Sequence, residues 1–169
     1  MYRYSFSDMD CSIARSLELV GEWWTFLILR ESFNGVRRFD DMQKHLGIAR
    51  NVLTNRLNSL VENGILSKVR YQEKPERYEY RLTDKGRDLY PVLLALKQWG
   101  DKWLDLPSTV AFTHKTCGHR TEPQFTCDHC GKPIHVREMV PEFLECDSGN
   151  LTAIGDSKRA PARIIQKDK

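Results

Sequence analysis

The stretch that decides the fold spans residues 39–63 and has the sequence FDDMQKHLGIARNVLTNRLNSLVEN. Its first eight residues have apolar side chains three and four positions apart, which predicts a short helix, and Gly47 stands where a helix commonly ends. Residues 50–63 predict a second helix, which Gly64 stops. Two short helices joined by a tight turn predict a helix-turn-helix.

The second predicted helix has two different faces. Leu53, Leu57 and Leu60 share a narrow arc at about 100° per residue and predict the face that packs on the core. The opposite face carries Asn51, Thr54, Asn55 and Asn58, with Arg50 and Arg56 beside it. Asn can pair with adenine, Thr can contact a thymine methyl group, and Arg can bind phosphate or guanine. An ordinary exposed face is the alternative, but such faces are usually rich in Glu and Lys, and this one has a single acid, Glu62.

Two strands with alternating polarity follow, over residues 65–71 and 78–82, and a charged segment connects them. This hairpin has the position of a wing beside the helix-turn-helix. Further candidates for DNA contact are Lys68, Arg70, Lys74 and Arg77 on the hairpin, and Arg37 and Arg38 before the first helix. Glu73, Glu76 and Glu79 weaken the case, so a solvated hairpin without DNA contact remains the alternative.

Charge is concentrated in the same part of the chain. The whole sequence has 26 Lys and Arg against 23 Asp and Glu, but residues 37–81 have ten against six. A local basic surface fits phosphate contacts. The hydrophobic fraction of 40% is enough for a core, and no apolar run approaches the ~20 residues of a membrane span. Without a signal-like N-terminus either, we expect a cytoplasmic protein that does not enter a membrane.

The segments on either side predict more helices and an α+β fold. Residues 10–31 predict two helices broken near Gly21. After the hairpin, Thr83 begins a predicted long helix with apolar residues at spacings of three and four. We expect Pro91 to kink this helix and Pro107 to end any continuation.

The order of these features resembles the HxlR-type winged helix-turn-helix regulators over residues 9–104. The resemblance rests on residues 11–14 (CSIA), 19–30 (LVGEWWTFLILR), 38–40 (RFD), 52–57 (VLTNRL), 62–66 (ENGIL) and 78–86 (YEYRLTDKG). It implies a dimeric bacterial or archaeal transcription factor, in which the first helix and the long C-terminal helix form the dimer interface. The expected partners are double-stranded operator DNA and a second copy of the chain.

Two positions of the resemblance bear on stability and regulation. The family usually has Ser-Pro at the start of the second helix of the motif, whereas this chain has Ala49-Arg50, which removes a cap worth ~1 kcal/mol. Cys11 lies near the N-terminus of the first helix, where the helix dipole favours a thiolate. The equivalent cysteine is a redox or electrophile sensor in several family members, so Cys11 is a redox-sensing candidate; a buried inert thiol is the alternative.

Cysteine and histidine gather in residues 110–136, after the winged helix. The segments 114–118 (HKTCG) and 127–131 (CDHCG) repeat one pattern, in which a ligand, two residues and a cysteine are followed by glycine. This spacing predicts two knuckles, and His114, Cys117, Cys127 and Cys130 predict one closed structural zinc site in a small ribbon-like lobe. His119 competes with His114 for the fourth place, and His129 and Cys146 are weaker candidates. An unmetallated lobe and a Cys127/Cys130 redox pair are the alternatives.

The predicted organisation is therefore a winged helix over residues 9–104, a zinc lobe over residues 110–136, and an aperiodic segment over residues 147–169 that we expect to be a mobile tail. No nucleotide-binding loop, carboxylate pair or nucleophile-base arrangement stands out, so we do not expect an enzyme. We predict a DNA-binding transcriptional regulator that acts as a homodimer. The alternatives are a thiol- or metal-responsive sensor whose cysteines control DNA affinity, and a protein-interaction module that does not bind DNA.

Overall fold

The computed structural model describes residues 5–6, 11–105, 108 and 110–141. It divides the chain into two units, residues 1–111 and 112–169, which are described separately below. The segment 147–169 and Cys146 lie outside the described residues, so the predicted tail and the weakest zinc-ligand candidate are not described.

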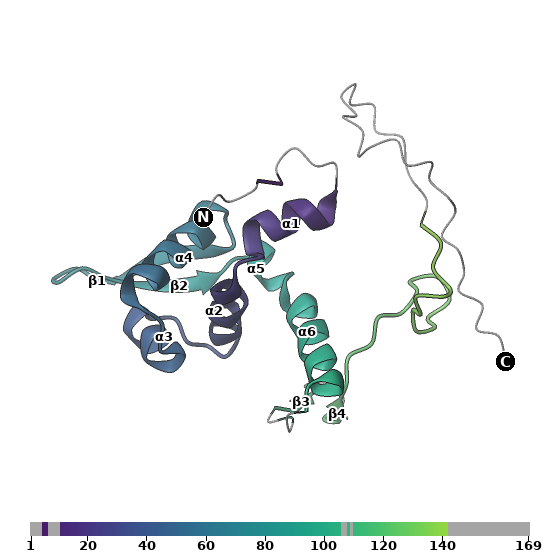
Figure 1. Ribbon diagram of the computed structural model, residues 1–169. Helices are drawn as coiled ribbons and strands as arrows, with labels where there is room; N and C mark the ends of the chain where they lie inside the picture. The colour runs from purple at the N-terminus through teal and green to yellow at the C-terminus, as the bar shows by residue number, and fades with distance from the viewer. Residues whose placement is uncertain (1–4, 7–10, 106–107, 109, 142–169) are drawn as a thin grey trace. The chain divides into compact units, whose positions relative to one another are not determined.

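The first unit contains six helices and one hairpin among its described residues. In chain order these are α1 (Ser12–Val20), α2 (Trp23–Phe33), α3 (Phe39–Leu46), α4 (Arg50–Glu62), β1 (Leu66–Gln72), β2 (Arg77–Leu82), α5 (Asp84–Arg87) and α6 (Tyr90–Trp103). In Figure 1 the β1–β2 hairpin extends outward from the packed helices α2, α3 and α4. The helix-turn-helix and the wing thus form as the sequence predicts.

The core of this unit lies where α2, α4 and the base of the hairpin meet. Its centre is Ile28 and Leu29 of α2 and Leu53 and Leu57 of α4, all with no exposed area. The complete buried apolar cluster is Val20, Ile28, Leu29, Met42, Ile48, Leu53, Leu57, Leu60, Ile65, Leu66 and Tyr80. Full burial of a Leu or Ile side chain stabilises the fold by ~1.5–3 kcal/mol, so this cluster fixes how α4 is presented.

A left-handed residue makes the turn between α3 and α4. Gly47 has φ of 63°, a backbone conformation that costs a residue with a Cβ about 1 kcal/mol, and its N–H donates to Gln43 O over 2.9 Å. The next residue, Ile48, is buried in the core. The turn is therefore closed by a hydrogen bond and anchored by an apolar side chain, which sets the start of α4.

The wing is a two-stranded antiparallel sheet, with pairs running from Leu66–Leu82 to Arg70–Tyr78 and an irregularity after Arg70. Each strand begins one residue away from its predicted start. The segment before α3 lies alongside β2, because Tyr80 N–H donates to Arg37 O over 2.7 Å and Arg38 forms a single bridge with Glu79. The wing is thus tied to the N-terminus of the helix-turn-helix.

The prediction of one long helix kinked at Pro91 is wrong. Thr83 caps only the short helix α5, where its Oγ1 accepts a hydrogen bond from Gly86 N–H, and the chain turns before α6 begins at Tyr90. Pro91 lies in the first turn of α6, where its missing N–H costs nothing. A Cβ on Gly86 would clash with the carbonyl of Ile65, so this glycine lets α5 pack tightly on the hairpin base.

The second unit has little regular structure. Its strands β3 (Phe112–Thr113) and β4 (Arg120–Thr121) form one short antiparallel pair, and Thr126 and Pro133 form a single bridge. Between residues 112 and 141 no residue is buried. Across the described residues of both units, the helices fall short of the length and apolar character that a membrane span requires.

Candidate nucleic-acid interface

The outer face of α4 carries three asparagines on one stripe. Asn51, Asn55 and Asn58 are exposed and lie four and three residues apart. Within the described part of the chain, their side chains form no hydrogen bond or ion pair. The buried Leu53 and Leu57 hold the opposite face of α4 against the core, so these three amides face solvent from a fixed support.

Three other polar residues of α4, Arg50, Thr54 and Arg56, already have partners. Thr54 Oγ1 donates to Arg50 O over 2.8 Å, and Arg50 forms an exposed ion pair with Asp40 at 3.5 Å. Such an exposed pair contributes ~0–1 kcal/mol, so Arg50 can exchange Asp40 for a phosphate at small cost. Arg56 is half-buried and pairs with Glu22 at 3.4 Å, which joins α4 to the start of α2. This contact favours a bracing role for Arg56 over DNA contact.

The start of α4 lacks a side-chain cap. Ala49 occupies the N-cap position with φ of −63° and ψ of 138°, and no side chain there accepts a hydrogen bond from the first turn. The N–H groups of the first turn of α4 therefore need another partner. A phosphate oxygen is a suitable acceptor, because a helix N-terminus favours negative charge.

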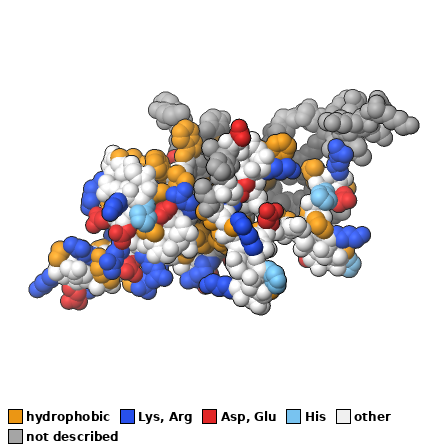
Figure 2. Space-filling view, turned by 90° about the horizontal axis from the view of Figure 1, so that it is seen from below, with side chains coloured by type: hydrophobic (Ala, Val, Ile, Leu, Met, Phe, Trp, Pro, Cys, Tyr) orange, Lys and Arg blue, Asp and Glu red, His pale blue; other side chains and the backbone are white. Residues whose placement is uncertain are grey.

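Basic side chains line a groove between α3, the start of α4 and the wing. This basic groove has a volume of about 430 Å³ and includes four of the predicted DNA-contacting residues, Arg38, Arg50, Lys68 and Arg77. Figure 2 shows Lys and Arg side chains interspersed with Asp and Glu on the viewed face of the molecule. Asp40, Asp41 and Glu76 also line the groove, so its positive charge is local and does not form a continuous surface.

Aromatic rings position three of the four cations. The Arg38 guanidinium lies 4.6 Å from the ring centre of Tyr71, and the Arg50 guanidinium lies 4.7 Å from that of Phe39. Lys68 Nζ lies 4.2 Å from the ring centre of Tyr78. Each cation–π contact contributes ~0.5–1 kcal/mol at an exposed site and restricts a long side chain before any ligand arrives. Sequence analysis did not identify these ring contacts, because each joins two residues that are ten or more positions apart in the chain.

The remaining candidates for DNA contact on the wing differ in whether their charges are already paired. Arg70 pairs with Glu76 at 3.3 Å and with Glu73 at 3.6 Å, so the acids that weakened the prediction do neutralise it. Lys74 and Arg77 are exposed, and their side chains have no ion-pair partner in the described chain. Lys74 and Arg77 are therefore more available than Arg70 for contact with DNA phosphates.

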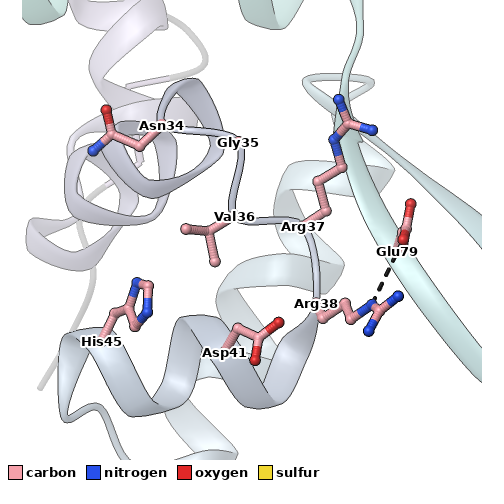
Figure 3. Close-up of a pocket in the computed structure, with 8 residues that line it drawn as sticks. All are labelled: Asn34, Gly35, Val36, Arg37, Arg38, Asp41, His45 and Glu79. Atoms are coloured by element: carbon pink, nitrogen blue, oxygen red, sulfur yellow. Dashed lines mark ion pairs between the residues drawn. The ribbon is translucent and has the colours of Figure 1, made fainter.

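A second hollow, of about 510 Å³, lies between the α2–α3 turn, α3 and β2. Figure 3 shows that Arg38 reaches toward Glu79 of β2, with an ion pair at 3.7 Å, while Arg37 points to a different side. His45 lines the same hollow and its Nδ1 lies 2.9 Å from a carboxylate oxygen of the buried Glu31. Burial by itself would raise the pKa of Glu31, but the hydrogen bonds from His45 and Arg30 outweigh burial and lower it. This pair braces α3 against α2.

The cysteines occupy two different settings. Cys11 is the half-buried N-cap residue of α1, as predicted, and its thiol makes no capping hydrogen bond. In the second unit, His114 Nδ1 lies 3.4 Å from Cys117 Sγ. Hydrogen bonds from the backbone N–H groups of Cys130 and His129, and then from the Cys130 thiol, lower the pKa of Cys127. The described residues contain no group of three or more candidate metal ligands, so the two predicted knuckles appear as two separate pairs.

Comparison with known proteins agrees with this architecture. The HxlR-like helix-turn-helix family matches residues 19–108. The uncharacterized HTH-type transcriptional regulator Rv3095 of Mycobacterium tuberculosis is 50% identical over 133 residues, which cover 78% of this chain and 84% of that protein. An uncharacterized HTH-type transcriptional regulator of Synechocystis, sll1512, is 39% identical over 99 residues, which cover 58% of this chain and 73% of that protein. These names describe regulators, in agreement with the expectation that the chain is not an enzyme.

Solved structures give the same fold. The crystal structure of PA1607, named as a candidate transcription factor, superposes with a TM-score of 0.73 at 37% identity and covers 82% of this chain and 99% of that one. The redox regulator HypR in its reduced form gives a TM-score of 0.53 at 29% identity, covering 56% of this chain and 95% of that one. The matches to Rv3095 and PA1607 are longer than the 111 residues of the first unit, so both extend into the second unit. The chain belongs to the HxlR-like helix-turn-helix family.

Proposed function

We propose that the protein is a transcriptional regulator that binds operator DNA as a homodimer, with α4 in the major groove and the β1–β2 wing on the phosphate backbone. The observation that carries this proposal is the stripe of Asn51, Asn55 and Asn58. Three unpartnered amides on one exposed helical face, supported from behind by buried leucines, form a surface suited to hydrogen bonding with bases. Membership of a family whose relatives are named as transcriptional regulators supports it.

The proposed division of labour follows from side-chain chemistry. The asparagines contact base edges, since an amide can both donate and accept and so matches adenine N6 and N7. Arg38, Arg50, Lys68 and Arg77 in the basic groove contact phosphates, and Lys74 extends this contact along the wing. Phosphate contacts set position and affinity, whereas base contacts set sequence preference.

The homodimer is supported by exposed apolar side chains on α1 and α6. Ile13 and Leu17 lie one turn apart on α1, and Trp99 and Trp103 are 58% and 65% exposed on one face of α6. Val92 and Leu96 continue that face toward the start of the helix. An exposed apolar face of this kind is typical of a protein–protein interface. In a two-fold dimer the same face of each copy would be buried against the other copy.

DNA binding is tested by selecting duplexes from a random pool with the full chain and measuring affinity by fluorescence anisotropy at several salt concentrations. We expect binding that weakens steeply with salt, since neutralised phosphates release counterions. Asn55→Ala should weaken binding to the selected duplex by roughly 5- to 150-fold, equivalent to ~1–3 kcal/mol. Asn34→Ala, which changes an exposed asparagine outside α4, is the matched control. Failure to bind any duplex would instead support a protein-interaction module.

Dimer formation is tested by light scattering. We expect a mass twice the 19.7 kDa of the chain, and a shift toward one chain mass for Trp99→Ser combined with Trp103→Ser. Val136→Ser, at an apolar residue of the second unit that is 89% exposed, should leave the mass unchanged. A wild-type mass of one chain at micromolar concentration would contradict the homodimer.

A thiol-responsive mechanism is a second candidate, favoured by the position of Cys11 at the N-cap of α1. Because α1 carries part of the proposed dimer face, oxidation of Cys11 would act on the dimer that holds two α4 helices on DNA. The likeness to the redox regulator HypR supports this candidate. Peroxide or a quinone should change operator affinity of the wild type and leave Cys11→Ser unaffected; equal responses would refute it.

A further inference from the structure

The second unit contains two turns with the same backbone hydrogen bonds. In the first, His114 N–H donates to His119 O over 2.9 Å, and Gly118 N–H donates to His114 O over 2.8 Å. In the second, Cys127 N–H donates to Lys132 O and Gly131 N–H donates to Cys127 O, both over 2.8 Å. The sequence offsets are identical in the two turns, and Gly118 and Gly131 have nearly equal positive φ values of 72° and 69°.

Each turn brings one pair of metal-ligating side chains together. In the first turn, His114 Nδ1 and Cys117 Sγ are 3.4 Å apart. In the second turn, Cys127 and Cys130 occupy the positions that His114 and Cys117 occupy in the first, three residues apart within the same pattern of backbone hydrogen bonds. Imidazole nitrogen and cysteine sulfur are the ligands of structural zinc sites, and a turn that gathers two of them supplies half of a tetrahedron.

The described part of this unit, residues 112–141, shows no other means of holding a fold. No residue described from 112 to 141 is fully buried, Val136 and Val140 are 89% and 83% exposed, and each strand has two residues. Apolar burial is the main favourable term in folding, and a segment without a buried core usually needs a disulfide, a metal or a partner to hold it. The four cysteines of the described chain are free thiols. Well-formed turns without a core are typical of a unit that a metal holds together.

We propose that one zinc ion joins the two turns of the second unit, with His114, Cys117, Cys127 and Cys130 as its four ligands. Because the described residues bring these groups together only in pairs, the ion would complete the site by drawing one turn to the other. Four protein ligands leave no open coordination position, so the zinc is structural and stabilises the unit without catalysis. The matches to Rv3095 and PA1607 extend into this unit, which agrees with a folded part of the protein. The site is independent of the proposed DNA contacts.

The proposal is tested by the zinc content of the full chain, purified under reducing conditions without chelator and measured by mass spectrometry. We expect about one zinc ion per chain in the wild type and in Cys11→Ser, the matched cysteine control outside the unit. Cys127→Ser and Cys117→Ser should lower the content to near zero. His114→Gln should lower it as well, whereas His119→Gln and His129→Gln should leave it unchanged. If zinc content were lost with His119→Gln and retained with His114→Gln, the assignment of His114 as the fourth ligand would be overturned.

Cobalt substitution gives a second readout that does not depend on how well each variant folds. The wild type loaded with Co²⁺ should show the visible bands of tetrahedral coordination together with an intense thiolate-to-cobalt charge-transfer band, whose intensity corresponds to three thiolates. Less than about half an ion of zinc per chain, or an octahedral cobalt spectrum, would overturn the proposal. A Cys127–Cys130 disulfide in the protein as isolated, with no bound metal, would overturn it in favour of a redox pair.

Discussion

The two units of this chain differ in whether a buried apolar core supports their structure. The described part of the first unit packs eleven buried apolar residues into one cluster, and its helix-turn-helix and wing are arranged around that core. The second unit buries none between residues 112 and 141, and is organised by two glycine-closed turns that present cysteine and histidine. The difference teaches that the first unit should fold without any ligand, whereas the order of the second should depend on what its cysteines bind.

Removal of a core side chain should produce the largest effect. Leu57→Ala empties a fully buried position of α4 and should lower the free energy of unfolding by roughly 2–5 kcal/mol, the usual cost of a large-to-small core substitution. Phe125→Ala in the second unit removes a larger side chain, but one that is 57% exposed, and should cost less than about 0.5 kcal/mol. Urea unfolding followed by circular dichroism compares them; similar losses would break the contrast between the units.

Metal removal should affect only the second unit. After chelation, the amides of Gly118 and Gly131, which close the two turns, should lose protection from hydrogen exchange, because no core restrains them. Amides of α2 and α4 should keep theirs. Exchange followed by mass spectrometry, with and without chelator, makes the comparison; loss of protection across α4 would show that the first unit also depends on metal.

The Glu31–His45 pair should give a smaller, pH-dependent effect within the first unit. The pKa of Glu31 is lowered by folding, so its ionisation stabilises the fold above the ordinary pKa near 4.5, and this contribution is lost as pH falls through the folded-state value. Glu31→Gln should cost ~1–2 kcal/mol at pH 7 and progressively less in acid. The exposed Glu62→Gln is the control. A difference between wild type and Glu31→Gln that grows toward low pH would contradict this reasoning.

The smallest expected effect is that of removing a single arginine on the salt dependence of DNA binding, compared between the two units. Arg77→Ala should remove one phosphate contact, reduce the slope of log affinity against log salt by about 1, and weaken binding to all sequences alike. Arg137→Ala, an exposed arginine of the second unit, should leave the slope unchanged. A slope that changes with Arg137→Ala and not with Arg77→Ala would place the DNA contact in the second unit and contradict the proposed interface.

Most of the fold could be predicted because its determinants are local. Helix ends at Gly47 and Gly64, the leucine spacing of α4 and the alternation of the hairpin each depend on a few neighbouring residues. The long helix was mispredicted because Pro91 suits the first turn of a new helix as well as a kink, and the close approach of Gly86 to Ile65 joins residues too far apart in the chain to be read from local sequence. The locations of the α4 candidates followed from periodicity. Contacts between distant segments, such as Arg56 with Glu22 and the rings under Arg38 and Arg50, have no local signal.

The central claim, that the asparagine stripe of α4 specifies the DNA sequence, is tested most directly by a ratio of affinities. The measurement compares binding to the selected duplex with binding to a scrambled duplex of equal length and salt, for the wild type and for Asn51→Ala/Asn55→Ala/Asn58→Ala. Because these side chains are exposed and unpartnered in the described structure, the variant should fold as the wild type does. We predict that the ratio falls toward one while affinity for the scrambled duplex and its salt dependence stay unchanged. A ratio that stays at the wild-type value would contradict the account.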